Sequence, residues 1–309
     1  MKIAFFTEMG FKGKIPRNHK NMRTEFAWMV ALDADHYHLQ DQLNQKYDLG
    51  IAINSKKHPE WVDVKRLKNY CSKVAVMQEG PFWLFQDYEL PKQIHYFNNL
   101  TEADIILAHN EQDKKYYQGL TNHKDVRVLP SLMIEDPLDF SKLTFDDREG
   151  IMVGGNMVSW YGGFDSFILS SSVTDKISSP KMGRAIEGEE QLGINQLPYM
   201  QWDEWIKALS NYKIGVHLMR THAAGTFALN CSYLGIPCIG YEGLDTQRTL
   251  HPNLTVKDGD LNQARTILDK LWDDVDFYKE NSILTKQLYK KNYHEDIFNS
   301  TFKKQLEIS

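Results

Sequence analysis

The segment at 225–240, GTFALNCSYLGIPCIG, contains the clearest chemical pattern in the sequence. Gly225 permits a tight turn, a short helix follows, and Gly235 and Pro237 end that helix before an apolar strand. The turn presents backbone N–H groups at the start of the helix, where these donors and the helix dipole favour an anion. The pattern predicts a phosphate-binding turn, and an unrelated helix–strand unit is the alternative.

A second candidate binding segment is the loop after the first predicted strand. Basic side chains gather there between the breakers Gly10, Gly13 and Pro16, namely Lys12, Lys14, Arg17, His19, Lys20 and Arg23. In an otherwise acidic protein this concentration indicates an anionic partner. Donor phosphates, an acidic glycan and a nucleic-acid backbone are the candidates, and a solvated loop without a ligand is the alternative.

The elements that must position these segments follow an alternating pattern. Short apolar runs predict strands and longer mixed stretches predict helices, which together favour βαβ units and parallel sheets. Strands are expected at 3–6, 49–53, 73–77, 104–108, 127–129, 151–153, 167–169, 213–218, 237–239 and 253–256. Helices are expected at 22–32, 202–210, 227–234 and 261–271, with one or two more after 275. A charged stretch at 134–150 is the expected interdomain linker.

Length and composition limit the possible function classes. A chain of 309 residues predicts two domains, and two α/β domains form a ligand cleft at the carboxyl ends of their sheets. The net charge of −5 excludes a uniformly basic nucleic-acid binder. No apolar run approaches the ~20 residues that span a bilayer. The three cysteines lack metal-ligand spacing, and the first residues do not resemble a signal peptide. These features predict a reduced, cytoplasmic protein.

The segment at 225–240 resembles the donor-binding segment of GT-B glycosyltransferases, in which a small-residue turn leads to a Glu, a small helix and Gly-x-Pro. In that family the turn holds the pyrophosphate of the donor, which implies donor contacts by Gly225, Thr226 and Phe227. The family's ribose-binding Glu is replaced here by Asn230, which can still hydrogen-bond a hydroxyl but lacks the charge. The turn and helix at 197–206 are similar to a family segment beside the donor base.

The stretch at 151–164 is similar to the first strand and turn of the GT-B donor domain, which implies donor contacts at Gly154 and Gly155. The family's Arg and Lys-Gly pair, which serve the diphosphate, are missing from this stretch. Arg184 and Arg220 are the expected substitutes, with surface ion pairs as the alternative. The glycines do not form Gly-x-Gly-x-x-Gly followed by an acid, so a nicotinamide site is not indicated.

Two predicted strand ends in the first half supply candidate catalytic residues. Retaining GT-B enzymes place a His at the end of the strand equivalent to 73–77, and Glu79 occupies that place here. A carboxylate there would act as a base or stabilise an oxocarbenium-like charge. His109 follows a strand that begins Ala-Asp, as in the family, and is expected to contact substrate. A structural role is the alternative for each residue.

The layout is also similar to bacteriophage DNA glucosyltransferases. The likeness rests on the Gln that ends the strand before Glu79, the Ala-Asp strand, a Trp followed by Gly-Phe, and the Gly-x-Pro segment. It extends over most of the chain but is thin at any one place, and it does not establish DNA as the acceptor. In this arrangement the basic loop faces the cleft, with Lys14, Arg17, His19, Lys20 and Arg23 as the expected acceptor contacts.

The resemblance implies an α/β protein of the GT-B fold with two Rossmann-like domains. The expected divisions are an acceptor-side domain at 1–148, a donor-binding domain at 149–275 and a helical tail at 276–309 that packs back on the first domain. The implied activity is hexosyl or pentosyl transfer from a nucleotide sugar, a UDP-sugar first, to a hydroxyl, with no metal and no further cofactor.

Three hypotheses remain open for the biological role. A hydroxymethylated base in phage DNA fits the basic loop, and a cell-surface or lipopolysaccharide glycan fits the family at large. A non-catalytic GT-B-like binding protein fits the missing Arg, Lys and Glu.

Overall fold

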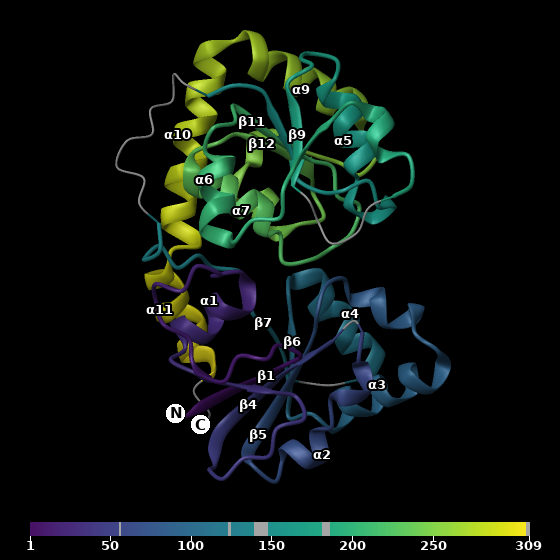
Figure 1. Ribbon diagram of the computed structural model, residues 1–309, viewed down its shortest axis with the longest axis vertical. Coiled ribbons are helices and arrows are strands. Elements are labelled where there is room, and N and C mark those ends of the chain that lie inside the picture. Colours follow the sequence, from purple (N-terminus) through teal and green to yellow (C-terminus); the bar gives the residue numbers. More distant parts are fainter. Residues whose placement is uncertain (56, 123–124, 139–147, 181–185, 307–309) are drawn as a thin grey trace.

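The computed structural model describes residues 1–55, 57–122, 125–138, 148–180 and 186–306. Two β-sheets form the centres of two halves, which lie one above the other in Figure 1. The first sheet belongs to the N-terminal part of the chain and the second to the part after residue 150. The last two helices run from the second half back to the first (Figure 1).

The first sheet is parallel except at one edge. Its order is β2-β3-β1-β4-β5-β6-β7, and only the β2–β3 pair is antiparallel. The central strands are buried on both faces because helices cover both sides of the sheet. The strands are β1 (Ile3–Thr7), β2 (Gly13–Lys14), β3 (Asp35–His38), β4 (Tyr47–Asn54), β5 (Cys71–Gln78), β6 (Ile105–Ala108) and β7 (Val126–Val128).

Helices pack on both faces of this first sheet. One face carries α1 (Thr24–Ala31) and α11 (Glu295–Leu306). The other carries α2 (Val64–Leu67), α3 (Leu90–Glu102) and α4 (Glu111–Thr121), with the short 3₁₀ turns η1 (Pro59–Trp61) and η2 (Phe82–Asp87). Figure 1 shows α1 and α11 on the opposite side of the strands from α2 and α3.

The second sheet has the order β10-β9-β8-β11-β12-β13, with every neighbouring pair parallel. Its strands are β8 (Ile151–Val153), β9 (Ile177–Pro180), β10 (Asn195–Leu197), β11 (Ile214–His217), β12 (Cys238–Tyr241) and β13 (Thr255–Val256). The helices α6 (Trp202–Leu209), α7 (Thr226–Leu234), α8 (Asp245–Leu250) and α10 (Val275–Asn292) supply buried side chains on one face. The helices α5 (Gly163–Ser170) and α9 (Leu261–Asp273) cover the other face. Short 3₁₀ turns complete this half: η4 (Ser159–Tyr161), η5 (Glu189–Leu192) and η6 (Pro252–Leu254).

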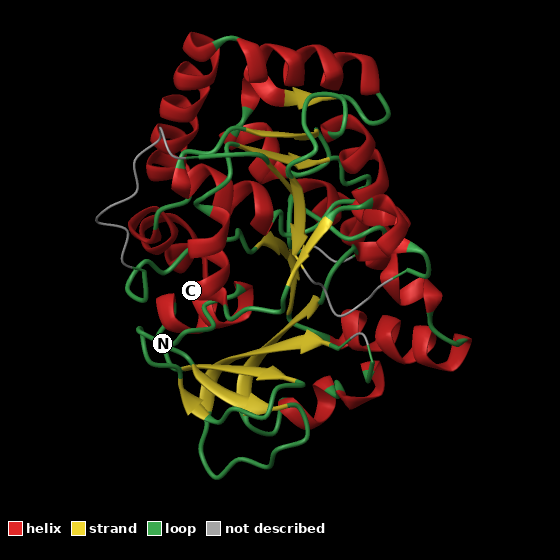
Figure 2. Ribbon diagram, turned by 45° about the horizontal axis from the view of Figure 1, so that its top comes forward, coloured by secondary structure: helices red, strands yellow, loops and turns green. Residues whose placement is uncertain are grey.

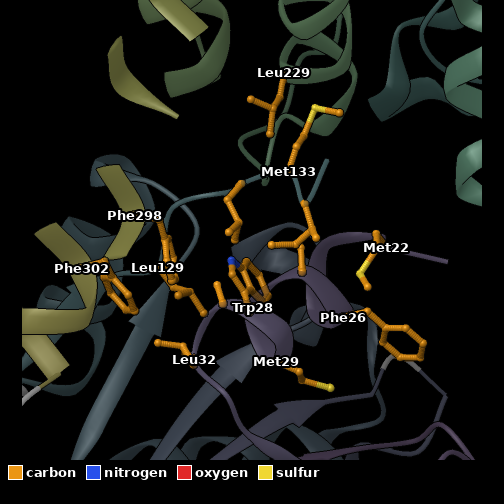
Figure 3. Packing of buried hydrophobic residues seen from close by; sticks show 14 of the residues in the cluster. Met22, Phe26, Trp28, Met29, Leu32, Leu129, Met133, Leu229, Phe298 and Phe302 are labelled. Atoms are coloured by element: carbon orange, nitrogen blue, oxygen red, sulfur yellow. The ribbon is translucent and has the colours of Figure 1, made fainter. Parts of the chain in front are cut away.

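One apolar cluster joins the two halves. Leu229 of α7 and Met133 lie above Trp28 of α1, and Phe298 of α11 lies beside Leu129 (Figure 3). All of these side chains are at most a few per cent exposed. The layered arrangement of strands between helices is visible in both halves (Figure 2). The halves are therefore packed against each other near α1, α7 and α11.

The prediction of an α/β protein with two Rossmann-like sheets is confirmed. The predicted strand at 167–169 is wrong, because these residues lie inside α5. Gly162 has φ +66°, a left-handed conformation that starts this helix. A run of three apolar residues does not distinguish a strand from one turn of a buried helix. The strands β3 and β9, each next to an edge strand, and the edge strand β10 escaped prediction because their sequences contain polar residues or proline.

None of the helices in the described parts of the chain combines the length and the apolar composition needed to cross a bilayer.

Candidate functional site

Two cavities lie where the carboxyl ends of the two sheets face each other. The first has a volume of about 270 Å³ and is lined mainly by the segment that leads into α1, the segment around Pro198, α6 and α7. The second, of about 210 Å³, is lined by the ends of β5, β8 and β11, by η4 and by α1. Four residues line both cavities: Thr24, Gly154, Thr226 and Phe227. The two cavities therefore meet at the N-terminus of α7.

The turn before α7 requires glycine at position 225. Gly225 has φ +68°, which side-chain-bearing residues rarely adopt, and an added Cβ would lie 2.0 Å from Thr246 Oγ1. The Thr246 hydroxyl also donates to the Gly225 carbonyl oxygen at 2.9 Å. This turn directs the first N–H groups of α7 toward the junction of the cavities, where helix geometry leaves them without intrahelical acceptors. The predicted turn is therefore formed at the expected place, with Gly225, Thr226 and Phe227 all lining the second cavity, and anion binding by it stays a prediction.

Gly154 lets β8 approach α7 and β11 closely. A Cβ at this position would lie 2.6 Å from Phe227 Cδ1 and 2.7 Å from His217 Cγ. Gly154 also donates its N–H to the Val216 carbonyl oxygen at 2.8 Å, which continues the ladder between β8 and β11. Gly155, its predicted companion, packs on Tyr161 and does not line either cavity.

His217 ends β11 in the wall of the second cavity. The side chain is 5 % exposed, and its ring lies edge-on to Phe227 with centroids 5.3 Å apart. Neither ring nitrogen has a hydrogen-bond partner within the described residues. Burial lowers the pKa of His217 to about 4, so the imidazole is neutral at pH 7.

Asn230 lines the first cavity together with Trp205 of α6. With the amide oriented so that both of its ends are satisfied, Trp205 Nε1 donates to Asn230 Oδ1 at 3.1 Å. Asn230 Nδ2 then donates to the Thr226 carbonyl oxygen at 3.2 Å. The amide thus connects α6 to the first turn of α7, and this engagement reduces the capacity left for a ribose hydroxyl.

Glu79 and His109 come together at the end of the first sheet. Both line the second cavity. His109 Nε2 lies 3.0 Å from the carbonyl oxygen of Gln78, the residue that ends β5, and Glu79 follows it. Asn54 Nδ2 donates to Gln78 Oε1 at 2.9 Å, and Gln78 Nε2 donates to the Glu79 carbonyl oxygen at 2.9 Å. These bonds fix the backbone that carries Glu79.

The basic loop is arranged differently from the expectation. Of its predicted contacts, Arg23 lines the first of these two cavities, and the others line neither. Arg23 Nη2 donates to the Met200 carbonyl oxygen at 2.8 Å, and its guanidinium lies 5.1 Å from the centre of the Tyr199 ring. Arg23 therefore links the first half to the second at the mouth of this cavity.

The other basic residues of the loop are engaged elsewhere. Lys14 Nζ lies 2.8 Å from Asp33 Oδ1, and Arg17 makes paired hydrogen bonds with Asp136 and with Glu295. These two carboxylates raise the pKa of Arg17. Such pairing compensates the charges of Lys14 and Arg17, two of the cations that motivated an anionic acceptor at this loop.

His19 and Lys20 also have positions away from the cavities. The His19 ring packs edge-on against Phe26 with centroids 5.1 Å apart, and His19 Nδ1 accepts from the Asn21 N–H at 3.1 Å. The Lys20 carbonyl oxygen accepts from the N–H of Asp203 in α6 at 3.1 Å. Both residues shape the loop and its contact with the second half.

Of the two predicted diphosphate cations, the structure describes only Arg220, which is not brought to either of these two cavities. Arg220 follows β11, but its guanidinium pairs with Asp165 of α5 at 2.5 Å, and this carboxylate raises its pKa. Arg220 lines neither cavity. Arg184 lies outside the described residues.

Several cavity residues escaped the sequence prediction. Glu25 in the first turn of α1 contributes a second carboxyl group to the second cavity, and Trp160 and Tyr161 contribute stacked rings with centroids 3.8 Å apart. His217 was not predicted as a cavity residue because it stands within an apolar strand. The signal in α1 was a Thr-Glu pair at the start of a predicted helix, but only the fold shows that this helix end faces α7.

The comparisons with known proteins identify the fold. No family model matches the sequence, and a search of curated proteins finds no match either. Anabaena Alr3699/HepE, solved with UDP-glucose, matches with a TM-score of 0.71 and 11 % identity over 99 % of each chain. Sucrose-phosphate synthase from Thermosynechococcus elongatus matches with a TM-score of 0.71 and 11 % identity over 98 % of each chain.

A third solved structure matches over a shorter part of its own length. A mutant of S. aureus TarM, solved with fondaparinux, alpha-GlcNAc-glycerol and UDP, has a TM-score of 0.66 and 8 % identity. That match covers 84 % of this chain and 55 % of the other. These likenesses, with the two facing parallel sheets, show that the chain has the GT-B fold.

Proposed function

We propose that this protein is a glycosyltransferase that moves a sugar from a nucleoside diphosphate sugar to an acceptor hydroxyl. The observation that carries the proposal is the continuity of the two cavities through the N-terminus of α7. An aromatic cavity, the turn before α7 and a cavity with Glu25 and Glu79 in its lining follow one another in that order. A nucleotide sugar has the matching order of base, diphosphate and sugar.

The first cavity suits the nucleoside. Trp205 and Tyr199 supply aromatic surface, and Pro180 and Pro198 supply rigid apolar surface. A planar base gains from stacking on such side chains. The diphosphate then lies at the first N–H groups of α7, with the Arg23 guanidinium on the same cavity wall. The sugar extends past Gly154 into the second cavity.

The second cavity suits the reaction. The acceptor oxygen forms a bond to the anomeric carbon, and the bond from that carbon to the diphosphate oxygen breaks with its electron pair on the diphosphate. Glu79 is positioned to take the acceptor proton or to stabilise positive charge on the sugar ring. The α7 dipole and N–H groups stabilise the charge that develops on the leaving diphosphate. Neutral His217 faces the same space as a hydrogen-bonding group.

UDP is the nucleotide that we propose first. HepE and TarM were solved with UDP or UDP-glucose, and both share the fold of this chain. The DNA acceptor is not part of the proposal, because the loop that motivated it holds its Lys14 and Arg17 in ion pairs. A non-catalytic binding protein is the competing hypothesis, and turnover separates it from the enzyme.

Calorimetry of the 309-residue protein with a panel of UDP-, TDP-, ADP- and GDP-sugars tests donor binding. An assay for release of the nucleoside diphosphate then tests turnover. We expect one donor class to bind and to be turned over. Glu79→Gln should keep donor affinity and lower turnover by roughly 10²–10⁴-fold, the usual contribution of a general base. Binding without turnover by the unaltered protein supports the non-catalytic hypothesis, and absence of binding to every donor refutes the proposal.

A further inference from the structure

Side chains of the first half hold the segment that leads into α7 in the second half. Ser131, which follows β7, donates its hydroxyl to the Ala224 carbonyl oxygen at 2.7 Å. Asn110, the N-cap of α4, has its Nδ2 atom 3.5 Å from the Ala223 carbonyl oxygen. Two consecutive carbonyl groups of the segment are therefore directed toward the first half.

Ser131 is itself held firmly in the first half. Its side chain is buried, at 4 % exposed. The carbonyl oxygen of the preceding residue, Pro130, accepts a hydrogen bond from Trp28 Nε1 at 2.8 Å. Trp28 is buried in the cluster that joins the halves, below Met133 (Figure 3). Because the neighbouring backbone is fixed in this way, Ser131 offers its hydroxyl from a defined position.

The direction of a carbonyl group decides the direction of the N–H group that follows it. A trans peptide is planar, and its C=O and N–H bonds point to opposite sides. The Ala224 carbonyl points toward Ser131, so the Gly225 N–H points away from Ser131. The Gly225 carbonyl accepts from the Thr246 hydroxyl at 2.9 Å, which fixes the Thr226 N–H by the same rule. One hydroxyl from each half thus orients these two N–H groups.

These N–H groups belong to residues that line the second cavity. Gly225, Thr226 and Phe227 are all in its lining, and Gly225 has the left-handed conformation with φ +68°. Within the described parts of the chain, no hydrogen-bond acceptor meets the N–H of any of these three residues. Successive N–H groups at such a turn form a concavity that binds anions. In the proposed function, the diphosphate supplies the acceptor oxygens.

We infer that Ser131 is a positioning residue for the diphosphate, because from the first half it orients N–H groups with which the second half binds this group. The inference rests on the proposed glycosyltransferase function. Loss of the hydroxyl removes the donor to the Ala224 carbonyl and lets the peptide between Ala224 and Gly225 rotate. Affinity for the diphosphate then falls, although Ser131 lines neither of the two cavities.

The test compares UDP with uridine, which share the base and the ribose and differ in the diphosphate. Calorimetry gives the Kd for UDP, and displacement of UDP gives the Kd for uridine. Ser131→Ala should raise the Kd for UDP roughly three- to tenfold, the effect of one hydrogen bond, and leave the Kd for uridine within about twofold. Ser131→Thr keeps the hydroxyl and should bind UDP within about twofold of the unaltered protein.

Ser282→Ala is the matched control at the other end of α7. The buried Ser282 hydroxyl donates to the carbonyl oxygen of Gly235, the C-cap of this helix, at 2.5 Å. Its loss also removes a buried hydrogen bond to α7, but it should leave the ratio of the UDP and uridine Kd values unchanged. Thermal melting by circular dichroism checks that each variant is folded.

Three results overturn the inference. The first is an unchanged Kd ratio in folded Ser131→Ala. The second is equal weakening of UDP and uridine, which would place the effect on the first cavity through the neighbouring Leu132. The third is a folded Ser131→Thr that binds UDP as weakly as Ser131→Ala does. If the donor panel selects another nucleotide, its diphosphate and nucleoside replace UDP and uridine. Failure of the unaltered protein to bind any sugar nucleotide is a different result, because it refutes the proposed function itself.

Discussion

Gly154→Ala tests whether the close approach of β8 to α7 builds the donor site. The added Cβ would lie 2.6 Å from Phe227 Cδ1 and 2.7 Å from His217 Cγ, well inside normal contact distances. Both neighbours are buried, so relief requires movement of their side chains or of the α7 N-terminus. Overpacking of this kind costs about 1–3 kcal/mol. For a domain of about 150–250 residues, a destabilisation of this magnitude lowers the Tm by roughly 2–12 °C.

The same displacement should weaken donor binding. If α7 moves to relieve the contact, its first N–H groups leave the diphosphate position, and a loss of about 1–3 kcal/mol corresponds to a roughly 5- to 160-fold higher Kd. Calorimetry with UDP and with the best UDP-sugar measures this change. Gly119→Ala is the control, because an added Cβ on this α4 residue meets nothing within 4 Å. Wild-type affinity and wild-type Tm in Gly154→Ala would refute the reasoning.

Three further predictions follow from individual contacts. Arg23→Ala should raise the Kd for UDP roughly tenfold or more because a charge-assisted contact is lost. Arg220→Ala should change this Kd less than twofold because Asp165 holds that guanidinium. Calorimetry on both variants measures the two effects, and a larger effect of Arg220→Ala would contradict the placement of Arg23 at the diphosphate. Trp205→Phe removes the donor to Asn230 Oδ1 and should lower the free energy of unfolding, measured by urea titration, by about 1–3 kcal/mol. An unchanged free energy of unfolding would mean that the Asn230 amide does not depend on this hydrogen bond. His217 and His251 have folded-state pKa values of about 4 against 6.5 when exposed. The unfolded chain therefore binds more protons between these values, so stability is complete above about pH 6.5 and falls as the pH drops toward 4, by about 3 kcal/mol per histidine. Urea titrations at several pH values measure this slope, which should be shallower in His217→Gln.

Sequence patterns predicted the turn, helix and strand at 225–240 well because their signals are local. Gly225, Gly235 and Pro237 act through backbone conformation, which depends on neighbouring residues rather than on distant contacts. The helix between the glycines was therefore predicted almost to the residue. Apolar runs gave the central strands for the same reason, since a buried parallel strand reads as a continuous apolar segment.

The ion-pair partners of the basic residues could not be predicted from the sequence. The basic loop looked like a binding surface because its partners are far away in the chain, with Asp136 and Glu295 closing on Arg17 from the linker and from α11. Arg220 was expected at the donor but pairs with Asp165. A cation's role depends on which carboxylate the fold brings to it, and that is a property of three-dimensional packing.

By itself, the sequence determined that the chain forms two α/β halves and that a glycine turn at Gly225 begins a helix. Both conclusions follow from short-range physics, namely apolar periodicity and backbone freedom at glycine. Only the tertiary structure decided which groups meet at that turn. It brought Glu25, Glu79 and His217 from different strands and helices to one cavity and placed Arg23 in the other. Long-range packing of the two halves decides which of these side chains share a cavity.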